Sequence, residues 1–144
     1  MRKTNRIIVV VFILLVGTLM TGCQKTEKPD PNVVSKYSDA EFQKMMTAVN
    51  AGDYAKFSEN FDGPMKQAMN EEKFKDFASK VKTNLGEYQS SIFTGTDKAQ
   101  QYTRAFYNVT FSLEKNPVQF TVVFSEQGGK ILVSGLFSTS PKLK

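Results

Sequence analysis

Residues 104–125 read RAFYNVTFSLEKNPVQFTVVFS, and in two stretches of this segment every second residue is apolar. The first stretch has its apolar positions at Ala105, Tyr107, Val109, Phe111 and Leu113, and the second at Val118, Phe120, Val122 and Phe124. A period of two is typical of a β-strand with one apolar face. Asn116-Pro117 lies between the stretches and predicts a turn. The segment therefore predicts two consecutive strands of an antiparallel sheet.

The residues on either side extend this predicted sheet. Gln127-Gly128-Gly129-Lys130 is a hairpin signal, because glycine adopts the positive φ that tight turns require. The strand after this hairpin has its more apolar face at Ile131, Val133, Gly135 and Phe137. Residues 88–96 predict a weaker strand before the central pair. The complete prediction from these patterns is a four-stranded antiparallel sheet.

The residues before the sheet have a helical period instead. Ser38-Asp39-Ala40-Glu41 has the form of a capping box, which predicts a helix beginning there. The apolar residues of this helix share one face and are Phe42, Met45, Met46 and Val49. Gly52 is placed to end the helix.

Shorter helical segments follow. Asp53 is the expected cap of a segment that contains Tyr54, Phe57 and Phe61, and residues 65–69 add a further turn or two. Asn70 is the expected cap of a longer helix that closes at Gly86. Because the helices precede the strands, we predict an α+β domain with N-terminal helices packed on one face of the sheet.

The composition excludes several classes of catalytic and metal site. The chain has 144 residues, which suits one domain, and it contains no His and one Cys. Without His there is neither a Ser-His-Asp nor a Cys-His centre, and no zinc site with imidazole ligands. One Cys excludes an intrachain disulfide. We expect no metal and no cofactor.

Residues 1–22 have the layout of an export signal. Arg2, Lys3 and Arg6 precede an apolar run from Ile7 to Met20, which is shorter than the roughly 20 residues that a transmembrane helix needs. The run leads into Leu19-Met20-Thr21-Gly22-Cys23, which resembles a bacterial lipobox. The resemblance implies cleavage after Gly22 and attachment of a lipid to the Cys23 thiol. Such a protein is anchored in the membrane by acyl chains without spanning it.

Residues 24–36, after the lipidated Cys23, contain two prolines and no amphipathic period, and we interpret 23–36 as a flexible tether. Residues 37–144 are then the single folded domain. Without the three basic residues of the signal, 16 of the 19 basic residues remain against 14 acidic ones, a net charge of +2. This balance gives no reason to expect binding to nucleic acid, which requires a concentrated basic face.

The helix ends, turns and core aromatic residues resemble those of a known family. The matching residues are Asn50-Ala51-Gly52-Asp53-Tyr54, Phe57, Phe61, Glu71-Glu72-Lys73-Phe74, Leu85-Gly86, Tyr88 and Gly135-Leu136-Phe137. They look like a bacterial and archaeal lipoprotein domain of unknown function, similar in layout to the cystatin-like and nuclear-transport-factor-two-like superfold. The resemblance implies a cone in which helices cover a strongly curved sheet. It implies no catalytic residue.

A ligand pocket is conceivable between the helices and the sheet. Its candidate lining residues are Tyr107, Phe111, Phe120, Phe124 and Phe137, with the Tyr107 hydroxyl as a polar group. The alternative is that these aromatic residues simply form the core, since a small domain needs that buried area. Arg104 is the only ionisable side chain within a predicted strand, tyrosines apart, and it could bind an anion or form an ion pair.

The leading hypothesis is an exported, lipid-anchored module on the outer leaflet of the cell membrane. It would bind a small apolar ligand or an envelope protein without catalysis. A small enzyme of isomerase or dehydratase type, using Tyr107 or Arg104 on an apolar substrate, is one alternative; it would need a general base near the substrate. The strand half places its carboxylates at strand ends instead. A second alternative is an interaction protein that presents a sheet edge or forms a dimer.

Overall fold

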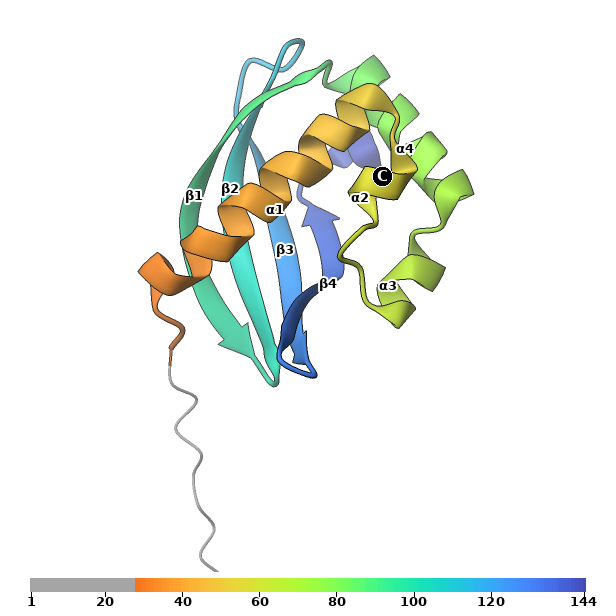
Figure 1. The fold of residues 1–144 in the computed structure, drawn as a ribbon. Helices are drawn as coiled ribbons and strands as arrows, with labels where there is room; N and C mark the ends of the chain where they lie inside the picture. The colour runs from red at the N-terminus through yellow and green to blue at the C-terminus, as the bar shows by residue number, and fades with distance from the viewer. Residues whose placement is uncertain (1–27) are drawn as a thin grey trace, which may run out of the picture.

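The computed structural model describes residues 28–144 (Figure 1). Its elements, in chain order, are α1 (Pro31–Ala51), α2 (Tyr54–Phe57), α3 (Gly63–Ala68), α4 (Glu71–Asn84), β1 (Tyr88–Ala99), β2 (Tyr102–Phe111), β3 (Val118–Gln127), β4 (Lys130–Ser138) and the short 3₁₀ helix η1 (Pro141–Leu143). The predicted order of helices followed by strands is confirmed. The predicted signal peptide and the lipidated Cys23 lie outside the described residues.

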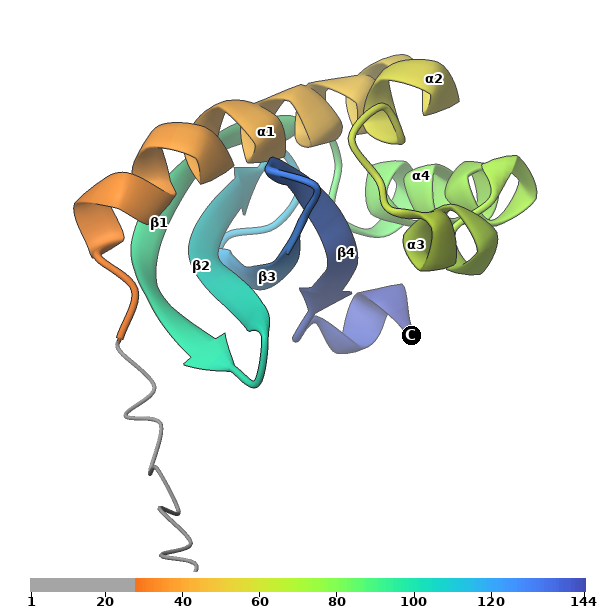
Figure 2. The same cartoon turned by 60° about the horizontal axis from the view of Figure 1, so that its bottom comes forward.

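The four strands form one antiparallel sheet in the order β1-β2-β3-β4. The sheet is curved, and α1 crosses one of its faces (Figures 1 and 2). We call the face toward α1 the covered face and the opposite face the open face. The predicted fold class, α+β with N-terminal helices on a four-stranded antiparallel sheet, is confirmed.

The start of α1 differs from the prediction. The helix begins at Pro31, and the Asp30 side chain caps it by accepting from the Asn32 N–H at 2.9 Å. Aspartate at the N-cap with proline at the first helical position is a favourable helix start. The predicted capping box at 38–41 is therefore wrong, and so is the extension of the tether to residue 36. Glu41 accepts from the Asn60 side-chain amide at 2.7 Å instead of capping the helix.

The predicted end of α1 and the predicted starts of α2 and α4 are confirmed, whereas α2 ends at Phe57 and does not reach Phe61. Gly52 ends α1 with φ at 68°, and the Asp53 side chain caps α2. Asn70 caps α4 by accepting from the Lys73 N–H at 3.0 Å. These predictions are correct because a cap acts through residues three or four positions away, which makes its signal local.

The core lies between the covered face of the sheet and the helices. The predicted helix face, Phe42, Met45, Met46 and Val49, is buried. Phe42 stacks on Tyr107 of β2 with ring centroids 4.3 Å apart. Phe57 and Phe74 bring α2 and α4 together at 4.6 Å between ring centroids. Aromatic contacts therefore join the helices to each other and to the sheet.

A β-bulge changes which residues of β4 face the core. Val133 pairs with Phe124, whereas Gly135 pairs with Val123, so Ser134 is an extra residue without a partner across the strands. One extra residue moves the side chains that follow to the opposite face. The predicted apolar face of this strand is therefore wrong beyond the bulge. Phe137 is on the open face and 62% exposed, and Leu136 packs against the core in its place.

Candidate functional site

The structure does not gather the six predicted ligand-binding residues around one cavity. Tyr107, Phe111, Phe120 and Phe124 are buried in the core between sheet and helices. Phe137 and Arg104 lie on the open face of the sheet, as the pairing of their strands places them. The geometry therefore supports the interpretation that these four aromatic side chains form the core.

The Tyr107 hydroxyl is held inside the domain. It is 2.6 Å from Ser38 Oγ and 2.9 Å from Asp39 Oδ1, and it donates its one proton to these two acceptors on α1. Burial raises the pKa of Tyr107, because the phenolate would be poorly solvated there. Tyr107 is only 1% exposed. The hydroxyl therefore has a structural role, linking β2 to α1.

Arg104 is also engaged within the protein. Its Nε donates to Asp97 Oδ1 at 2.6 Å, and its second guanidinium nitrogen donates to Asp97 Oδ2. This hydrogen bond from Arg104 holds the pKa of Asp97 below its usual range. The guanidinium carbon also lies 5.7 Å from the centre of the Phe106 ring. Of the two roles predicted for Arg104, anion binding and ion pairing, the structure shows the ion pair.

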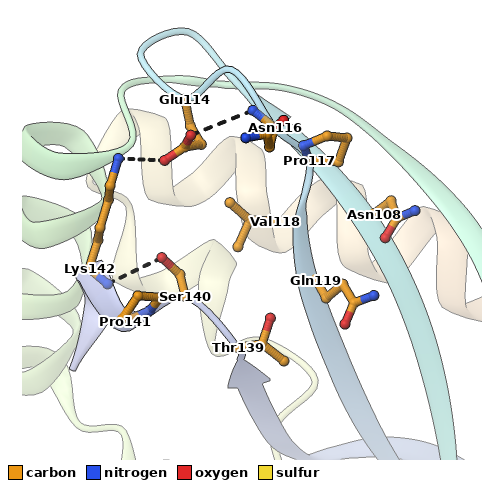
Figure 3. A pocket seen from close by; sticks show the side chains of 10 residues that line it. All are labelled: Asn108, Glu114, Asn116, Pro117, Val118, Gln119, Thr139, Ser140, Pro141 and Lys142. Carbon is orange, nitrogen blue, oxygen red and sulfur yellow. Dashed lines mark hydrogen bonds and ion pairs between the residues drawn. The ribbon is translucent and has the colours of Figure 1, made fainter.

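A groove of about 520 Å³ lies at the end of the sheet that carries the β2–β3 loop (Figure 3). Three segments line it: the end of β2 with the loop after it, the beginning of β3, and the chain from the end of β4 into η1. The lining residues are Asn108, Glu114, Asn116, Pro117, Val118, Gln119, Thr139, Ser140, Pro141 and Lys142. We call this the β3 groove.

The wall formed by η1 is fixed by contacts to distant segments. Lys142 pairs with Glu114 across the groove (Figure 3), and its carbonyl accepts from the Asn84 side-chain amide at 2.9 Å. Leu143 packs against the core from the same turn. The hydrogen bond from Lys142 holds the pKa of Glu114 below its usual range. The groove is thus preformed, and its charged pair is internally neutral.

The other polar side chains of the groove are available to a ligand. The amides of Asn108, Asn116 and Gln119 make no side-chain hydrogen bond to another residue in the described part of the chain. A side-chain amide offers two donors and an acceptor oxygen. Three such groups around one concave surface can bind a polar, uncharged molecule.

Sequence reasoning did not identify this groove. The sequence predicts only a turn at Asn116-Pro117, and residues 139–142 carry no motif. The groove forms because η1 packs beside the β2–β3 loop. This contact joins Glu114 and Lys142, which are 28 positions apart in the sequence. Asn108 is an amide side chain within an otherwise regular strand, and it is the one local signal in the sequence that could have indicated the groove.

Residues 28–144 contain no group of three or more His, Cys, Asp or Glu residues arranged to hold a metal ion. None of the helices in this part of the chain has the length and apolar character needed to cross a bilayer.

The fold and the groove define a small α+β domain with a preformed polar groove at one end of an open sheet. The chain belongs to a family described as a protein of unknown function (DUF3887), whose model matches residues 42–131. This confirms the predicted resemblance at the level of a domain of unknown function. No curated protein matched the chain.

Proposed function

We propose that this protein is a lipid-anchored binding module of the cell envelope, which holds its ligand in the β3 groove without catalysing a reaction. The observation that carries the proposal is the groove itself, a preformed cavity of about 520 Å³ that is lined by three residues with unpaired side-chain amides. Ligand sites in proteins are typically concave and carry a few well-placed polar groups. The ligand would occupy this groove instead of the filled core.

The position of the groove suits an anchored protein. Because α1 begins at Pro31, only residues 24–30 separate Cys23 from the helix, and seven extended residues reach at most about 23 Å. In Figure 1 the chain enters α1 away from the β2–β3 loop, which lies at the opposite end of the sheet. A lipid on Cys23 would therefore leave the β3 groove facing away from the membrane.

The relation to the cystatin-like and nuclear-transport-factor-two-like superfold is part of the proposal. It is supported by the order of helices before strands and by α1 crossing one face of a curved sheet (Figure 2). Members of one superfold differ widely in activity, so this relation by itself favours neither binding nor catalysis.

The two alternatives have less support. The enzyme alternative relied on Tyr107 and Arg104, and both groups are bonded to protein partners, Tyr107 in the core. The sheet-edge alternative would use β1 or β4, the two edge strands. The edge of β4 is occupied at Val133 by a bridge to Phe61. Register shifts interrupt β1 between Phe93 and Gly95 and near Tyr88, and such irregularities make an edge a poor template for another strand.

Two measurements test the proposal. Mass spectrometry of the mature protein from membranes is expected to show Cys23 as the first residue with acyl chains attached; an uncut chain with a free thiol would contradict the anchoring. Hydrogen exchange of the same protein with solubilised envelope material is expected to slow at residues 112–119 and 139–142. Unchanged exchange there with every envelope fraction would contradict binding in the groove.

A further inference from the structure

We propose that the β3 groove and the adjoining open face bind an uncharged oligosaccharide chain, an inference that rests on the binding function proposed above. It names the ligand class of that site. Three observations support it. The groove adjoins a second depression, amide, hydroxyl and aromatic side chains lie along both, and the charged residues at each end are paired with each other.

The groove extends beyond the end of the sheet. A second depression, of about 240 Å³, lies beside it and shares Gln119 and Thr139 with it. Thr94, Phe106 and Thr121 line this second depression on the open face. We call the two depressions together the channel; it extends from the β2–β3 loop onto the open face, so a chain of linked units suits it better than a compact molecule.

The strand register arranges these residues in two rows across the open face. Asn108 of β2 is paired with Gln119 of β3, and the Thr139 N–H donates to the Gln119 carbonyl. One row further along the strands, Phe106 pairs with Thr121, which pairs with Phe137. A row of amide and hydroxyl groups thus lies beside a row with an aromatic ring at each end.

This pattern matches the chemistry of a saccharide. Each hydroxyl of a sugar both donates and accepts, as do the amides of Asn108 and Gln119 together with the Thr121 hydroxyl. The C–H face of a pyranose ring is apolar and packs on aromatic rings. Phe106 and Phe137 are two strands apart, about 10 Å, which is close to the length of two linked pyranose units.

Gly135 shapes the aromatic part of the surface. A Cβ at this position would lie 2.9 Å from Phe137 Cε2 and 3.3 Å from Val123 Cγ2. The absence of a side chain therefore lets the Phe137 ring lie close to the sheet. The Phe137 ring remains 62% exposed and is therefore available for an apolar contact with a ligand.

The charges favour an uncharged ligand. Lys142 is paired with Glu114 at one end of the channel, and Arg104 is paired with Asp97 beyond the other. Neither of these two pairs offers a net charge, so neither would attract an anionic polymer. A peptide that binds by adding a strand needs a free sheet edge. Apart from Thr94 of β1, the strand residues that line the channel belong to β2 and β3, the two central strands, which have no free edge.

The experiment is a titration of the full-length mature protein, labelled for NMR, with neutral tetrasaccharides of glucose and of N-acetylglucosamine. Polyglycerol phosphate serves as the anionic comparison and an unstructured peptide as the protein-like one. We expect the side-chain amide signals of Asn108, Asn116 and Gln119 to shift with at least one neutral saccharide. Gln119→Ala and Phe137→Ala should each weaken this binding about tenfold, as expected for losing one good contact.

The matched control is Gln101→Ala, an exposed glutamine in the β1–β2 hairpin at the far end of the sheet, which should bind like the wild type. If only the anionic polymer or only the peptide shifts the groove amide signals, the proposal that the ligand is a saccharide is wrong, whereas the proposal that the β3 groove binds a ligand is retained. Saccharide binding that Gln119→Ala does not weaken would overturn the site. If none of these probes shifts the groove amides, the saccharide proposal is wrong, and the hydrogen-exchange measurement separately decides the binding function.

Discussion

The Tyr107 hydroxyl lies 2.6 Å from Ser38 Oγ, a buried hydrogen bond between β2 and α1 that joins residues 69 positions apart. It connects the half of the domain that precedes the sheet with the sheet itself. It also accounts for a serine in the interior of α1, a place where serine is not favoured. Ser38 is completely buried, and Tyr107 supplies the partner that its hydroxyl needs.

Removing this hydroxyl should weaken the domain. Tyr107→Phe leaves the buried Ser38 without its partner, and we expect the free energy of unfolding to fall by about 1–3 kcal/mol. Urea unfolding followed by circular dichroism measures the change. Tyr102→Phe, in the β1–β2 hairpin, is the control and should have little effect. Equal midpoints for Tyr107→Phe and the wild type would show that the bond does not contribute.

Tyr107 should also make the stability of the folded domain sensitive to alkaline pH. Burial raises the pKa of Tyr107 above its ordinary value of 10.0, so the folded protein keeps the proton that the unfolded chain releases. The stability from this residue is complete below pH 10 and is lost as the pH rises above it. We expect a smaller loss of stability above pH 10 in Tyr107→Phe than in the wild type, measured by urea unfolding. Parallel pH curves would contradict this.

The η1 wall of the β3 groove should respond to acid. Lys142 holds the pKa of Glu114 below its ordinary value of 4.5, so the pair contributes stability above that value and loses it as the pH falls through the folded-state pKa. NMR signals of residues 141–143 are expected to change in this acidic range and to be much less dependent on pH in Glu114→Gln. If the variant keeps the wild-type transition, another group is responsible.

Gly86 should not tolerate a side chain. Its φ is 86°, and an added Cβ would overlap Ser112 Oγ and come within 2.7 Å of the Leu113 backbone nitrogen. We expect Gly86→Ala to lower the free energy of unfolding by about 2 kcal/mol or more and to displace the β2–β3 loop. Gly128→Ala is the matched control, with φ at 58° and open space around the site, and should cost about 1 kcal/mol. Equal losses would mean that the contact at Gly86 is unimportant.

The position of the α1 start can be tested directly. Asp30→Ala removes the cap and should lower the stability by about 1 kcal/mol, whereas Asp30→Asn keeps an accepting oxygen and should stay close to the wild type. Thermal unfolding compares the three proteins. A loss in Asp30→Asn as large as in Asp30→Ala would indicate that the carboxylate charge, and not the cap, stabilises the helix.

Local sequence patterns determined the type and order of the elements. The alternation at Ala105, Tyr107, Val109 and Phe111 predicted β2 because its period depends only on neighbouring residues. The caps at Asp53 and Asn70 were predicted for the same reason. Asp30-Pro31 carries an equally local start signal, but it lies among charged residues, and the absence of an amphipathic period in 24–36 predicts a tether there.

The tertiary structure alone decided which face each residue occupies and where a groove forms. The extra residue Ser134 placed Phe137 on the open face, because a bulge is defined by pairing with another strand. The β3 groove needed Lys142 to meet Glu114, a contact set by the packing of η1 against α4. Periodicity is a property of a single segment and can be seen in its sequence. A site forms where separate segments come into contact, and these contacts are determined by tertiary packing.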